Sequence, residues 1–173
     1  MTAGIMMLTS SLFAIPVFAA TDRGDISAGM KTLPLLTNKM AGTVKLAIVF
    51  DPANPASKQE AYGIKAILDS GFEAPGDLQL IGILVPVNGL GGMAGSRIAV
   101  LTNGLNAHYD SISTAAAAYN ILTMSTDLGC VQNNKCVLGI VSQPHVEIYY
   151  SQAAADAARI SFGKVFSILA NKI

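Results

Sequence analysis

Apolar runs alternate along this chain with segments that carry an apolar stripe at helical spacing. Runs rich in β-branched and aliphatic residues, typical of buried strands, occur at 44–50, 78–87, 97–102 and 121–125. Helical spacing occurs between them, at 57–71 and 106–120. The pattern predicts an α/β fold, a three-layer, mostly parallel sheet with helices on both faces.

Polar residues mark where the two helices should begin and end. Ser57 and Glu60 have the spacing of a capping box, and Gly71 can end that helix. Asn106 is a suitable N-cap for the second helix, which carries Ile112, Ala115, Ala116 and Tyr119 on one face. Another helix, interrupted by Pro34, is expected at 26–36. The glycine-rich segment 88–96 is expected to be a flexible connection, with a short turn of helix as the alternative.

The C-terminal part of the chain follows another pattern. The pattern of residues 136–150 predicts a β-hairpin around Gln143 and Pro144, with His145, Glu147 and Tyr149 on its solvent-exposed face. Residues 151–173 are expected to close the chain as helix, in which Ser161 can cap the last segment. The expected apolar stripe of that helix is Phe162, Val165, Phe166 and Leu169.

The first nineteen residues have the composition of an export signal. An apolar run leads to Pro16, and Val17 and Ala19 occupy the positions that a signal-peptide cleavage site requires. The alternatives are a buried helix or a membrane anchor, but the run is short for a membrane span. We therefore divide the chain into a cleaved signal peptide (1–19), an N-terminal helix and connector (20–43) and a single α/β domain (44–173), and expect a periplasmic protein.

The two cysteines, Cys130 and Cys136, support that location. Disulfides form in oxidising compartments, and the five-residue spacing matches neither a thioredoxin-like motif nor a zinc-binding pair. Asn133 and Asn134, between the cysteines, tolerate turn conformations. A turn closed by a disulfide is the first interpretation, and two unpaired buried cysteines are the alternative.

Composition excludes some classes of partner. Lys and Arg number 11, as do Asp and Glu, so the chain lacks the basic surplus of a nucleic-acid-binding protein. Low net charge favours association, and a homodimer is one form this could take. We expect no metal and no cofactor, because His108 and His145 lack metal-ligand spacing and the glycines at 89–95 match no nucleotide-binding fingerprint.

Ligands of open α/β sheets bind beyond the carboxyl ends of the strands, which makes those positions the candidate binding site. The candidates are Asp51, Asn54, Asn88, Thr102, Asn103, Ser125, Thr126 and Asp127. The same residue types are also common where a strand turns into a helix, so capping alone is the competing interpretation.

Catalytic constellations are missing from the sequence. No serine occupies a nucleophile elbow, and nothing places a nucleophile beside Asp51 and Asp127, which could form a carboxylate pair. A hydrolase at that edge is the weakest hypothesis, and we expect a protein that is not an enzyme.

The C-terminal third resembles the YfiR/HmsC-like family of exported bacterial proteins. The resemblance rests on residues 123–127 (TMSTD), Val146-Glu147-Ile148 and Ala153-Ala154-Ala155, and the strand order before them agrees over 44–173. It implies a periplasmic regulator, not an enzyme, that binds an inner-membrane signalling protein such as the sensor domain of a diguanylate cyclase. It also implies disulfides, in some members across a short loop.

A partner surface in such a protein would be apolar. Tyr149, Tyr150 and Phe162 are the candidates, although aromatic residues at such spacing are more often core. Residues 98–127 also resemble one lobe of a periplasmic solute-binding protein, which implies a small ligand at the strand ends. A single lobe lacks the second wall of such a site, so a partner or dimer would have to supply it.

Overall fold

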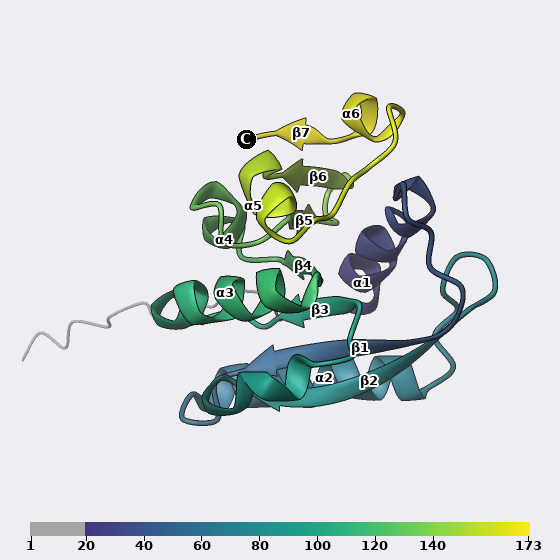
Figure 1. Cartoon of the computed structure of the whole chain (residues 1–173). Helices are drawn as coiled ribbons and strands as arrows, with labels where there is room; N and C mark the ends of the chain where they lie inside the picture. The colour runs from purple at the N-terminus through teal and green to yellow at the C-terminus, as the bar shows by residue number, and fades with distance from the viewer. Residues whose placement is uncertain (1–19) are drawn as a thin grey trace, which may run out of the picture.

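A seven-stranded sheet in the order β2-β1-β3-β4-β5-β6-β7 forms the centre of the molecule (Figure 1). The computed structural model describes residues 20–173, so the predicted signal peptide at 1–19 lies outside the described residues. Strands β1 to β5 are parallel, β6 runs antiparallel to β5, and β7 runs parallel to β6. The predicted mostly parallel α/β sheet is confirmed.

The four predicted strands form close to their expected positions. They are β1 (Gly42–Phe50), β2 (Leu78–Pro86), β3 (Ile98–Leu101) and β4 (Leu122–Ser125). Every residue of β3 and β4 is buried, as the continuous apolar runs of a sheet covered on both faces require.

Two hydrophobic cores lie on the two faces of this sheet. Ile26 and Met30 of α1 (Arg23–Met30) and Ile64 of α2 (Pro55–Asp69) belong to one core. Met93 of the 3₁₀ helix η2 (Val87–Met93) and Ile112 of α3 (Tyr109–Tyr119) belong to the other. The helices therefore cover both faces, and the segment 88–96, expected to be flexible, is largely a helical cover over the sheet.

Both predicted helix starts are wrong. Helix α2 begins at Pro55, and its N-cap is Asn54, three residues before Ser57; the Asn54 side chain accepts hydrogen bonds from the amides of Ala56 and Ser57. The end is as expected, because Gly71 follows the C-cap with a positive φ of 80°. Asn106 begins a 3₁₀ turn, η3 (Asn106–His108), and α3 starts after it without a side-chain cap.

Cys130 and Cys136 form the predicted disulfide, with a Cα–Cα distance of 5.2 Å. The bridged segment is more than a turn, since Cys130 lies in a short helix, α4 (Leu128–Gln132), and Asn134 has a left-handed φ of 57°. Both cysteines are fully buried in the second core.

The C-terminal hairpin is confirmed, with β5 (Leu138–Val141) paired to β6 (Glu147–Tyr150) across a cis Gln143–Pro144 peptide bond. The two helical segments expected after it, 151–160 and 161–173, form only in part. The chain instead forms α5 (Gln152–Ala157), a loop, a single turn α6 (Phe166–Leu169) and the short strand β7 (Asn171–Lys172). Of the expected stripe, Phe166 is buried and Phe162 half-buried, while Val165 and Leu169 are exposed.

The N-terminal helix also differs from its prediction. Helix α1 starts earlier, at Arg23, with an Asp22–Asp25 capping box, and ends at Met30. Pro34 lies in a separate 3₁₀ turn, η1 (Leu33–Leu35). No helix within residues 20–173 has the length and apolar character that crossing a membrane requires.

Candidate functional site

The strand order places a topological switch point between β1 and β3. The chain leaves β1 toward β2 on one side and returns to β3 on the other, so the connections diverge at this point. In sheets of this order the ligand crevice lies beyond the carboxyl ends of these strands. Asp51 follows β1, Thr102 and Asn103 follow β3, and Thr126 and Asp127 follow β4.

A buried carboxylate that the sequence did not single out as a site residue organises this edge. Glu60, on α2, accepts hydrogen bonds from the backbone amide of Asn103 (2.9 Å) and from its side-chain amide (3.0 Å). It also accepts hydrogen bonds from the amide (3.0 Å) and the hydroxyl (2.5 Å) of Thr21. Both Glu60 and Thr21 are buried. The spacing from Ser57 had suggested a helix cap, so only the tertiary fold reveals this role.

Thr126 completes the same network. Its hydroxyl lies 3.1 Å from the hydroxyl of Thr21 and accepts a hydrogen bond from the side-chain amide of Asn103 at 3.2 Å. The network thus joins the N-terminal segment, α2 and the ends of β3 and β4. Asn103 and Thr126, two of the predicted site residues, are brought together by it.

Thr102 and Ser125 are structural. Both are fully or almost fully buried, and their hydroxyls donate hydrogen bonds to the carbonyls of Val49 (3.1 Å) and Leu101 (3.3 Å). Ser57 lies 2.6 Å from the Thr102 hydroxyl and accepts a hydrogen bond from the amide of Asp51 at 2.9 Å. For these two candidates, as for the helix cap Asn54, local structure accounts for the residue type.

The two carboxylates of the hydrolase hypothesis have different partners. Asp51 accepts a hydrogen bond from the amide of Ala53 at 2.8 Å and lies 3.8 Å from Nε2 of His108. Asp127 caps α4 through the amide of Gly129 and accepts a hydrogen bond from the hydroxyl of Tyr109 at 2.5 Å. Each acid is held by its own neighbours, and no side chain among residues 20–173 is hydrogen-bonded to both carboxylates.

A cleft of about 280 Å³ opens beside the Glu60 network, at the carboxyl ends of β3, β4 and β5. Its lining includes Asn103, Thr126 and Ser142 from the strand ends and Asp22 and Asp25 from the N-terminal segment. Asp22 and Asp25 cap α1 reciprocally, which fixes both carboxylates at the cleft wall. We call this hollow the edge cleft.

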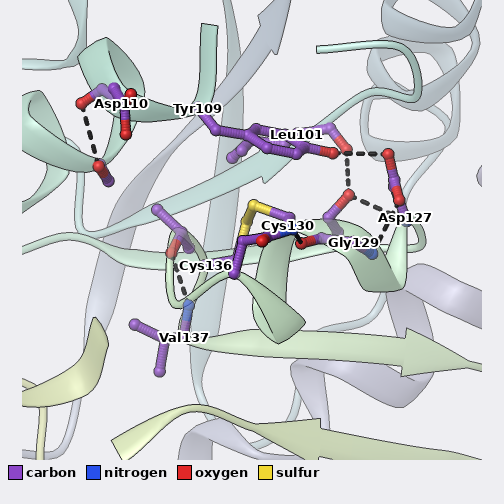
Figure 2. The surroundings of a disulfide bond; sticks show 12 residues. Leu101, Tyr109, Asp110, Asp127, Gly129, Cys130, Cys136 and Val137 are labelled. Carbon is purple, nitrogen blue, oxygen red and sulfur yellow. Dashed lines mark hydrogen bonds between the residues drawn. A yellow bond between two sulfur atoms is a disulfide. The ribbon is translucent and has the colours of Figure 1, made fainter. Parts of the chain in front are cut away.

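A second hollow, of about 520 Å³, lies beside the disulfide. Tyr109, Asp127 and Lys135 line it, and Figure 2 shows the Tyr109 hydroxyl bonded to Asp127 close to the Cys130–Cys136 bridge. Burial, and then the hydrogen bond to Asp127, raise the pKa of Tyr109 well above its ordinary value. The phenol therefore stays a hydrogen-bond donor at any physiological pH.

The remaining candidates lie elsewhere. Asn88 is exposed on η2 and lines neither of these hollows. Tyr150 makes edge-to-face contacts with Phe162 (5.6 Å between ring centroids) and with Phe166 (5.2 Å), and Phe162 stacks on Phe166. This aromatic cluster attaches the C-terminal segment to β6, so Tyr150 and Phe162 belong largely to the core. Tyr149 donates a hydrogen bond to Glu147.

Metal-binding geometry is not found in the described part of the chain. Within residues 20–173, no group of three or more His, Cys, Asp or Glu side chains is arranged to hold a metal ion.

Comparisons with known proteins identify the fold. No protein-family model matches the sequence, and a comparison with curated proteins finds no match. Among solved structures, the chain is similar to the open, ligand-free form of CD0873, a substrate-binding protein with adhesive properties from Clostridium difficile, with a TM-score of 0.61 and 10% identity over 90% of this chain and 60% of that one.

Two further structures share the fold at the same low identity. One is a conserved domain protein from Vibrio cholerae, with a TM-score of 0.58 and 10% identity over 87% of this chain and 59% of that one. The other is the ABC domain in complex with L-Trp from Streptococcus pneumoniae, with a TM-score of 0.58 and 10% identity over 87% of this chain and 60% of that one. The chain thus spans about three fifths of the length of these structures.

Proposed function

We propose that this chain is an exported binding protein that holds a small polar ligand in the edge cleft. The observation that carries the proposal is the position of the cleft, at the carboxyl ends of β3 to β5 and next to the switch point. Ligands of doubly wound α/β proteins bind at this location. The fold shared with a substrate-binding protein and with an L-Trp-bound domain supports the same interpretation.

The cleft lining defines the chemistry of the ligand. Asp22 and Asp25 supply negative charge, Asn103, Thr126 and Ser142 supply amide and hydroxyl groups, and the lining contains no Lys or Arg. A cation next to these carboxylates would gain a charge-assisted hydrogen bond. We therefore propose a ligand with a primary amine and further hydrogen-bonding groups, such as an amino acid or a small polyamine.

The edge cleft is open on one side, and a ligand held by one wall alone would bind weakly. We propose that a second wall closes over it, supplied by a further domain, a second copy or a partner protein. The three solved structures that share the fold, of which this chain covers about three fifths, make a further domain a natural source.

Thermal-shift measurements with the L-amino acids, putrescine and spermidine as probes test the small-ligand proposal. A bound probe should raise the melting temperature in proportion to its occupancy. Ser142→Leu, which fills the cleft, should abolish the shift. Ser111→Leu, at an exposed position on α3, is the matched control and should preserve it. A shift that survives Ser142→Leu unchanged would place the binding site elsewhere.

We also propose, as a second candidate, the regulatory function that the YfiR/HmsC-like resemblance implies. One observation favours a protein partner. The C-terminal segment exposes large apolar side chains, among them Ile168 at 82%, Leu169 at 63% and Val165 at 58%. Exposed apolar patches often mark interaction sites. The partner in this proposal is the periplasmic sensor domain of an inner-membrane diguanylate cyclase.

Membrane pull-down followed by mass spectrometry tests this second candidate. The wild-type chain should recover a cyclase, and Ile168→Lys should lose it. Lys58→Glu, an exposed change on α2, is the control and should retain it. Failure to recover a cyclase with a correctly folded, disulfide-bonded chain would reject the regulatory proposal and leave the small-ligand proposal standing.

A further inference from the structure

The opposite edge of the sheet, where the parallel strands begin, holds a second candidate binding site. A hollow of about 420 Å³ lies there, within the range typical of small-molecule sites. Its lining includes Arg97 and Arg159 together with the apolar side chains of Leu36, Met40, Tyr119 and Ile160. We propose that this hollow, the amino-edge pocket, binds a small amphipathic anion, a carboxylate or phosphate on an apolar body.

Charge is the first argument. Arg97 and Arg159 line the pocket, and no Asp or Glu does. Within residues 20–173, neither guanidinium forms an ion pair or donates a hydrogen bond to another residue, whereas Lys65, Lys135 and Arg23 all have partners. Guanidinium groups match the geometry of carboxylate and phosphate, to which they can donate two parallel hydrogen bonds.

The backbone at Arg159 is the second argument. Arg159 has a φ of 54° and occupies the left-handed position after α5. The amide of Arg159 donates a hydrogen bond to the carbonyl of Asp156, and the amide of Ile160 donates one to the carbonyl of Ala155. This is a Schellman arrangement, in which glycine is strongly preferred at that position. An arginine side chain near the end of a helix can also donate hydrogen bonds to the last carbonyls of that helix, but the Arg159 side chain makes no such hydrogen bond. The strained position is therefore explained if the side chain is needed in the pocket.

Rigid walls are the third argument. The amide of Thr37 donates a hydrogen bond to the carbonyl of Ser161 (2.9 Å), and the amide of Gly163 donates one to the carbonyl of Leu35 (2.8 Å). The segments 35–37 and 161–163, which are distant in sequence, therefore form one wall. Arg97 is fixed between its neighbours, because its amide bonds to Lys45 and its carbonyl accepts from Leu122. A preformed pocket loses little conformational entropy when it binds a ligand.

Apolar residues define the rest of the ligand. Leu36, Met40, Ile160 and the ring of Tyr119 lie in the same lining as the two arginines. A free inorganic anion would leave this surface unused, whereas an anion with an aromatic or aliphatic body would cover it.

Titration calorimetry on the full chain tests the site with benzoate, phenyl phosphate and inorganic phosphate as probes, and with benzamide as the uncharged analogue. Benzoate or phenyl phosphate should bind, and the tighter of the two identifies the preferred oxyanion. Arg97→Gln and Arg159→Gly should each weaken binding about tenfold, the loss expected from one charge-assisted contact. Lys58→Gln, exposed on α2, should leave binding unchanged.

Arg159→Gly also separates a binding role from a structural one. Glycine suits the left-handed position, so this variant should melt at a higher temperature than the wild type while binding the probes more weakly. Equal affinity for benzoate and benzamide, unchanged binding in both arginine variants, or inorganic phosphate binding as tightly as the aromatic probes would overturn the proposal. Ser142→Leu should leave benzoate binding intact, which distinguishes this site from the edge cleft.

Discussion

Glu60 accepts hydrogen bonds from both the backbone amide and the side-chain amide of Asn103, at 2.9 and 3.0 Å, although the two residues are 43 positions apart in sequence. With the two further donors of Thr21, four hydrogen bonds converge on one buried carboxylate that has no cationic partner among residues 20–173. Backbone and hydroxyl donors can satisfy a buried carboxylate in this way. The arrangement fixes Asn103 at the edge cleft.

Glu60→Gln should therefore destabilise the fold. The side-chain amide keeps the volume of Glu60 but turns an NH₂ group toward groups that are themselves donors. We expect the free energy of unfolding to fall by about 1–3 kcal/mol, the typical loss for an unsatisfied buried hydrogen bond. Urea unfolding measures it, with the exposed Glu73→Gln as control. Equal stability of the two variants would mean that the network contributes little.

Removing the disulfide should have a limited effect. The bridge closes a ring from residue 130 to residue 136, for which the chain-entropy estimate is about 2.4 kcal/mol. Cys130→Ala/Cys136→Ala should lower the free energy of unfolding by roughly that amount and leave the far-UV circular dichroism spectrum unchanged. Because both sulfurs are buried, the folded protein should resist mild reductants and be reduced readily only after denaturation. Rapid reduction of the folded chain would contradict this.

Stability should fall in alkaline solution because of Tyr109. Its pKa in the folded chain lies above the ordinary value of 10.0, mainly through burial and further through Asp127. Above about pH 10 the unfolded chain loses this proton while the folded chain keeps it, so the free energy of unfolding decreases as the pH rises. Below about pH 10 the contribution of Tyr109 to the free energy of unfolding is fully present.

Tyr109→Phe should make this decrease shallower. A smaller slope should remain, because the pKa values of Tyr149 and Tyr150 are also raised. At neutral pH the variant should be about 1 kcal/mol less stable, since Asp127 loses one hydrogen bond. Urea unfolding between about pH 8 and about pH 11 measures both effects. An unchanged slope would show that Tyr109 titrates normally in the folded chain.

Two glycines should respond to alanine in opposite directions. A Cβ on Gly139 in β5 would lie 2.6 Å from Cγ1 of Val131 and 2.9 Å from Cδ2 of Leu128, so these two side chains of α4 would have to shift. Gly139→Ala should cost about 1–3 kcal/mol. Gly63, exposed within α2, meets nothing within 4 Å, and Gly63→Ala should stabilise by about 0.5–1 kcal/mol. Thermal melts of the two variants measure this. A rise in the melting temperature of Gly139→Ala, as in that of Gly63→Ala, would contradict the packing of α4 against β5.

The sequence predicts the fold where one physical signal dominates. The strands are found because continuous aliphatic runs such as those of β3 and β4 are what a sheet covered on both faces needs. The hairpin can be predicted because Pro144 separates two strand-like segments. The disulfide can be predicted because the chain has only two cysteines.

Local signals fail where tertiary contacts decide. Ser57 and Glu60 have capping spacing, but Asn54 caps the helix first, which frees Glu60 to bind residues far along the chain. The apolar spacing after Phe162 resembles a helix, yet contacts with Tyr150 hold Phe162 and Phe166 in a loop and a single turn. Asn103 and Thr126 could be predicted as edge residues, whereas Thr21, Asp22 and Asp25 could not, because no local pattern connects them to the sheet.

The contact between Thr21 and Thr126 spans 105 positions, which affects how this protein can be divided. A shortened chain that begins at the first strand would retain every residue of the sheet and both cysteines. It would still lack one side of the edge cleft, because Asp22 and Asp25 come from the segment removed. Any fragment made to study recognition must therefore start no later than Ala20, the first residue of the cleft lining.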